Sequence, residues 1–264
     1  MLSEDGRKHL NTSRSLIRNF DALLIAEDEL RIRVRDRDAF IKAGVVLAFA
    51  VHTHRLGEMV LDLVERDTSM VLVLPSVRAC YETALTSHWI AQSADAAVAL
   101  FNEEIRQRRN LAKTLRSASS PAMAGFADHI AHTDLPDALT SSSAQAKSVE
   151  RMLQDFGSVG TDAYAYYRLL SGYSHPGGSL ADQYLEDHQT SPFTLRLEPS
   201  DPLTPDSGIY LIGCCLVWAG SAARYIQHDP RRRRQELRDA ATDLGISPDL
   251  HLGPQALHRQ PRRN

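Results

Sequence analysis

Apolar residues recur every three or four positions along most of the chain, which is the spacing of amphipathic helices. The first such segment is marked by Leu16, Phe20, Leu23, Leu24 and Leu30. A longer one covers residues 40–64. The two-residue alternation that is typical of strands is scarce. The pattern predicts an all-α fold, arranged as a multi-helix bundle.

Helix-breaking residues divide the rest of the chain. Further helices are predicted over about 71–91, 95–115, 149–156 and 161–174, in a short segment from Pro121, from about 207 to 228, and over 231–244. Residues 176–205 are rich in proline, glycine and aspartate and predict a loop-rich surface excursion, in which only 193–197 alternates as a short strand. We expect one helical domain over residues 1–246 and a disordered tail over 247–264.

The composition is that of an ordinary globular protein, with 264 residues of which 43% are hydrophobic and 24% charged. The first residues are polar and lack the apolar run of a signal peptide, which predicts a cytoplasmic protein. The longest apolar runs, 43–51 and 209–223, are shorter than the roughly 20 residues of a membrane span, so we predict no membrane association. Cys80, Cys214 and Cys215 form no disulfide framework and are expected to be core thiols.

Charge and motifs exclude several classes of function. The net charge of −3 argues against nonspecific coating of nucleic acid, although arginines cluster in 31–37, 106–109 and 231–234. The chain has no glycine-rich nucleotide motif, and we predict no cofactor. His129 and His132 lie one turn apart near Asp128 and Asp134, but no second ligand motif accompanies them. We therefore predict a solvated helix face and no metal there.

The segment YYRLLSGYSHPGG, residues 166–178, gives the strongest indication of a site. On a helix, spacings of four, three and four place Tyr164, Arg168, Ser171 and His175 on one stripe. The following proline and glycines are expected to end the helix beside the histidine. Tyr167, in the same segment, is a further candidate binding residue.

A second stripe consists of Arg78, Glu82, Leu85 and Trp89. Arginine one turn before glutamate is the less favourable order for an isolated ion pair, so partial burial beside Trp89 would explain it better than helix propensity. In one interpretation Glu82 orients Arg168 or His175. In the other it belongs to an ordinary salt bridge.

The pieces LPSVRACYETALTSHWI and YYRLLSGYSHP resemble an uncharacterised bacterial helical family, and Arg168 and His175 have the R-x(4-6)-H spacing of HEPN ribonucleases. The HEPN resemblance implies metal-independent RNA cleavage by a dimer, as in a toxin or antiviral effector. Arg168 would hold the scissile phosphate, and His175 would assist proton transfer at the 2′-hydroxyl. Glu82 would be a third catalytic residue. The binding residues of the same site would be Arg78, Tyr164, Tyr167 and Ser171.

A noncatalytic helical binding or scaffold module is the alternative. Active HEPN nucleases commonly have a polar residue after the arginine, whereas Leu169 follows it here. In this interpretation Arg168, Ser171 and His175 form a buried polar network that fixes helix packing. A homodimer is expected because HEPN-like domains pair and because helices such as that of 209–223 present apolar faces.

Overall fold

The computed structural model describes residues 2–26, 32, 37–131, 139–188, 191–227 and 231–259. Its helices are α1 Glu4–Ile25, α2 Arg37–Glu65, α3 Met70–Gln92, α4 Ala96–Arg116, α5 Pro121–Ala131, α6 Ser143–Ala146, α7 Val149–Gln154, α8 Ser158–Gly172, α9 Gly178–Ala181, α10 Pro205–Ile226, α11 Arg231–Leu244 and α12 Pro254–Arg259. The prediction of an all-α, multi-helix fold is confirmed.

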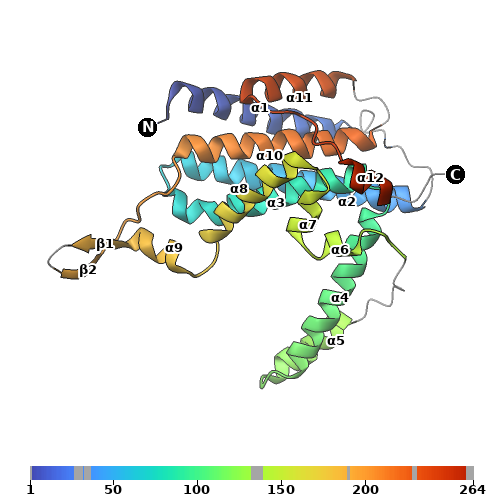
Figure 1. The fold of residues 1–264 in the computed structure, drawn as a ribbon, viewed down its shortest axis with the longest axis horizontal. Coiled ribbons are helices and arrows are strands. Elements are labelled where there is room, and N and C mark those ends of the chain that lie inside the picture. Colours follow the sequence, from blue (N-terminus) through green and yellow to red (C-terminus); the bar gives the residue numbers. More distant parts are fainter. Residues whose placement is uncertain are drawn as a thin grey trace.

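Helix α10 lies at the centre of the bundle and packs against α1, α2, α3 and α11 (Figure 1). Its first turn is fixed by Pro205 and by Thr204, whose hydroxyl accepts a hydrogen bond from the Ser207 N–H at 3.2 Å. Cys214 and Cys215 are buried on α10, and Cys80 is buried on α3. The three cysteines are therefore core thiols, as predicted.

Helices α2 and α10 extend well beyond the apolar runs on which the sequence analysis relied. By length and composition alone, both satisfy the requirement for a membrane span, which corrects the expectation that neither run was long enough. The most apolar window of α10 is 83% buried within the protein, whereas that of α2 is 28% buried. The burial of α10 is typical of a core helix. A cytoplasmic location stays a prediction.

Two parts of the chain extend from the bundle. Helices α4 and α5 form a hairpin that projects away from it (Figure 1). The excursion before α10 contains α9, a 3₁₀ turn Asp182–Tyr184, and the antiparallel strands β1 Leu185–His188 and β2 Ser191–Leu195. The predicted strand is β2 with shifted bounds. Its partner β1, of sequence LEDH, has no apolar alternation that would have revealed it.

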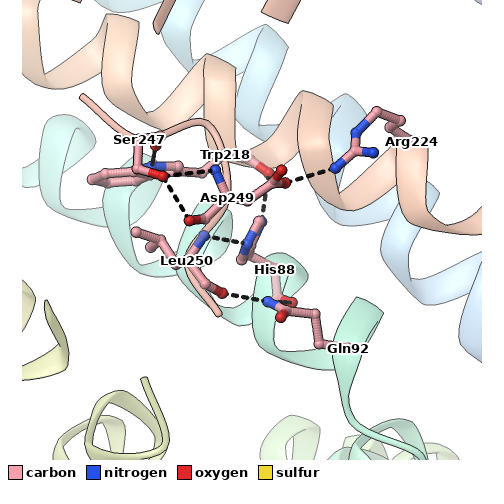
Figure 2. A network of polar contacts seen from close by, with 7 residues as sticks. All are labelled: His88, Gln92, Trp218, Arg224, Ser247, Asp249 and Leu250. Atoms are coloured by element: carbon pink, nitrogen blue, oxygen red, sulfur yellow. Dashed lines mark hydrogen bonds and ion pairs between the residues drawn. The ribbon is translucent and has the colours of Figure 1, made fainter. Parts of the chain in front are cut away.

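The segment 247–253, which we call the C-terminal strap, lies along the bundle (Figure 2). The Leu250 N–H donates to Nε2 of His88 at 3.0 Å, and Gln92 Nε2 donates to the Leu250 carbonyl at 2.5 Å. Trp218 Nε1 donates to the Ser247 carbonyl at 3.1 Å. These bonds place the strap against α3 and α10, in a region for which the sequence predicted disorder.

Helix α12, after the strap, is also held against the bundle. Leu252 and Ala256 are buried, and Arg259 forms an ion pair with Asp155. The Asp155 carboxylate also accepts a hydrogen bond from Nε1 of the fully buried Trp89 at 2.9 Å. Residues 247–259 therefore differ from the expected tail because their contacts are to residues far away in the sequence.

Candidate functional site: the α3–α8 network

Helix α8 carries the motif that the sequence singled out, but it ends earlier than predicted. It begins after Gly157, which has a φ of 66°, and its last residue is Gly172. The Tyr173 and Ser174 N–H groups bond three residues back, at 3.3 and 3.1 Å, which tightens the chain into a turn. Since a residue before proline disfavours the α conformation, His175 lies outside the helix. The predicted four-residue stripe is therefore broken at its last member.

Four of the candidate residues meet between α3 and α8, and we call them the α3–α8 network: Arg78, Glu82, Tyr167 and Ser171. Arg78 donates from Nε to the Ser171 Oγ at 3.0 Å and from Nη2 to the Tyr167 hydroxyl at 2.7 Å. The same Nη2 lies 3.2 Å from a Glu82 carboxylate oxygen. The Arg78 guanidinium carbon is also 4.9 Å from the centre of the Tyr167 ring. One guanidinium thus joins two helices.

A backbone contact deeper in the interface reinforces this junction. The Tyr81 hydroxyl donates to the Ala163 carbonyl at 3.3 Å, and both residues are buried. Helix α8 therefore packs directly against α3. In the network itself, the side chains of Arg78 and Glu82 retain 21% and 35% of their exposure, so water screens their charges.

Arg168 belongs to a separate, exposed arrangement. Its guanidinium carbon lies 6.0 Å from the centre of the Tyr164 ring, and the Tyr164 hydroxyl donates to Glu150 at 3.2 Å. The pKa of Arg168 is raised, first by its hydrogen-bonding contact with the Tyr164 side chain. The rings of Tyr164 and Tyr167 stack with 6.1 Å between their centres. This stacking places Arg168, Tyr164 and Glu150 beside the α3–α8 network. Among the described residues, no hydrogen bond or ion pair joins the two groups.

His175 is exposed in the turn that follows α8. Within the described part of the chain, neither His175 nor Arg168 forms a hydrogen bond or ion pair with Glu82, whose carboxylate is paired with Arg78. The structure therefore brings together Arg78, Glu82, Tyr167 and Ser171, and it leaves Arg168 and His175 at the surface.

Some participants escaped the sequence analysis. Glu150, which accepts the hydrogen bond from the Tyr164 hydroxyl, belongs to α7 rather than α8. Nothing in the local spacing of the sequence indicates that these two helices fold back on each other. Of the predicted histidine pair, His129 is exposed on α5, whereas His132 and Asp134 lie outside the described residues. In the described ranges, no three side chains of histidine, cysteine, aspartate or glutamate gather as metal ligands.

Fold and site define the chain as an all-α protein with a polar network between two packed helices. Comparison with protein-family models, with curated proteins and with solved structures finds no match. The resemblance to HEPN ribonucleases therefore stays an expectation from the sequence, based on the spacing of Arg168 and His175.

Proposed function

We propose that the protein is a noncatalytic helical binding module, in which the α3–α8 network is structural and holds α8 in place. The observation that carries this proposal is the set of contacts made by the Arg78 guanidinium. It donates hydrogen bonds to Ser171 and Tyr167 and forms an ion pair with Glu82. A guanidinium committed to three internal partners has few donors left for a substrate. Arg168, exposed beside Tyr164, is the cation through which α8 would contact an anionic partner.

The separation of Arg168 and His175 from Glu82 also favours a binding role. Cleavage of RNA by general acid and base groups requires them to converge on one phosphate and its neighbouring hydroxyl. Glu82 is paired with Arg78 in the interface, and His175 lies in the turn after the helix. The chain by itself does not gather the three proposed catalytic residues.

The test is incubation of the purified protein with end-labelled single-stranded RNA in EDTA, followed by denaturing and native gels. We expect the RNA to stay intact and to be retarded on the native gel, with less retardation by Arg168→Ala because a phosphate-binding cation is lost. Exposed Arg18, which has no partner among the described residues, provides a matched control as Arg18→Ala. Equal retardation by both variants would contradict the role of Arg168.

A metal-independent ribonuclease of the HEPN type is the second candidate. It is favoured by the exposure of both Arg168 and His175, which leaves each accessible to an RNA strand. This candidate predicts cleavage in EDTA that is abolished by Arg168→Ala and by His175→Ala, while both variants keep the melting temperature of the wild type. Such a result would overturn the noncatalytic proposal.

A further inference from the structure

A polar cavity of about 270 Å³ lies between α10, α11 and the C-terminal strap. None of its lining residues comes from α8, so it is separate from the α3–α8 network. Its polar lining consists of Ser221, Arg224, Tyr225, Arg234, Arg238 and Asp249. We call it the α10–α11 pocket.

Ser221 is fully buried, lines the pocket, and has no hydrogen-bond partner for its hydroxyl among the described residues. Hydroxyls in α2 and α3 are satisfied by the carbonyl four residues back, as in Thr53, Thr83 and Thr86, each at 2.8 Å. A buried hydroxyl without a partner costs free energy. Ser221 therefore places an unsatisfied hydroxyl in the wall of the cavity.

The charges at the pocket are unbalanced. Arg224 of α10 is paired with Asp249 of the strap at 2.7 Å. Arg234 and Arg238 lie one turn apart on α11 and are both exposed, and their guanidinium groups have no hydrogen bond or ion pair with any described residue. Two like charges at this spacing repel each other on an isolated helix. The pocket thus has an excess of two positive charges that nothing in the described chain neutralises.

The strap forms one wall of the pocket and is tied to the core. Asp249 and Pro248 line the cavity, and the next residue, Leu250, donates its N–H to the buried His88 (Figure 2). Arg224 also lies over the Tyr225 ring, with its guanidinium carbon 4.8 Å from the ring centre. These contacts hold one wall and one aromatic face in place before any ligand arrives.

We propose that the α10–α11 pocket binds a small phosphate monoester. A phosphate monoester carries close to two negative charges at neutral pH, which matches the two unpaired arginines. Guanidinium groups bind phosphate oxygens through pairs of parallel hydrogen bonds. The Ser221 hydroxyl supplies a further donor, and the Tyr225 ring offers an apolar surface to the organic group. The volume of about 270 Å³ suits a small molecule rather than a polymer.

The test is calorimetric titration of the full chain with glycerol 3-phosphate, with glycerol as the uncharged control ligand. We expect wild type to bind glycerol 3-phosphate and not glycerol. Arg234→Gln/Arg238→Gln should bind at least about tenfold more weakly. Arg18→Gln/Arg66→Gln removes two other exposed arginines whose guanidinium groups have no partner in the described part of the chain, and it should bind like wild type.

Hydrogen exchange gives a second readout that does not depend on net charge. Bound glycerol 3-phosphate should slow exchange of the Leu250 amide, because the ligand fixes the strap wall. Ser221→Ala should weaken binding without changing charge. Equal weakening by both arginine pairs, no binding by wild type, or tighter binding of a short single-stranded RNA through Arg234 and Arg238 would overturn the proposal.

Discussion

At the scale of single residues, the two fully buried histidines fix the protonation state that the fold requires. The Nε2 of His88 accepts the Leu250 N–H, so its proton is on Nδ1, which donates to the Trp218 carbonyl at 3.1 Å. Burial lowers the pKa of His88 to about 4 and that of His54 to about 3. Protonation of His88 would place a second donor against the Leu250 N–H.

This burial predicts a loss of stability in mild acid. In the unfolded chain both histidines bind protons below about pH 6.5, whereas in the folded protein they stay neutral until about pH 4 and 3. Stability is therefore unaffected by these groups above pH 6.5, and it falls by about 1.4 kcal/mol per pH unit for each histidine below that value. Urea unfolding at pH 7.5 and 5 measures the difference. Equal free energies of unfolding at the two pH values would contradict it.

At the scale of elements, one glycine sets how closely α7 and α8 approach. A Cβ added at Gly160 would lie 1.7 Å from the Leu153 carbonyl oxygen, which is backbone and has little freedom to move. Gly44, in α2, is exposed and has no atom within 4 Å of the same position. The two sites differ in packing and share a helical backbone.

We predict that Gly160→Ala destabilises the protein by about 3 kcal/mol or more, because the helices must separate. Gly44→Ala should instead stabilise it by up to about 1 kcal/mol, since alanine favours a helix and meets no obstacle. Thermal unfolding of both variants tests this comparison. Shifts of the same sign and size would show that the interface tolerates a side chain at Gly160.

The helices were predictable because their apolar periodicity is local, as for α3, which was predicted over 71–91 and spans Met70–Gln92. The strap was not, because its order depends on His88 and Gln92, some 160 residues earlier in the chain. The helical spacing singled out Ser171, which does contact Arg78, but it predicted neither that contact nor the one between Arg78 and Tyr167. It misplaced His175, because continuing a helical stripe assumes that the helix continues.

At the scale of the whole molecule, α10 determines what faces solvent. The apolar run 209–223 was expected to leave a face for a partner subunit, but α10 buries its sides against four other helices. This face gives no support to the expected homodimer, which stays a prediction. The fold instead leaves polar features at its surface: the exposed Arg168, and the α10–α11 pocket with two unpaired arginines.

The central claim is that Arg78 holds α8 to α3 as part of the structure. A double-mutant cycle of Arg78→Met and Tyr167→Phe, measured by urea unfolding, tests it most directly, because the second change removes only the hydroxyl that accepts the 2.7 Å hydrogen bond. A control cycle pairs Tyr167→Phe with Arg168→Ala. We predict a coupling of about 1 kcal/mol for the first cycle and additivity within about 0.3 kcal/mol for the control. Additivity in the first cycle would contradict the structural role of the network.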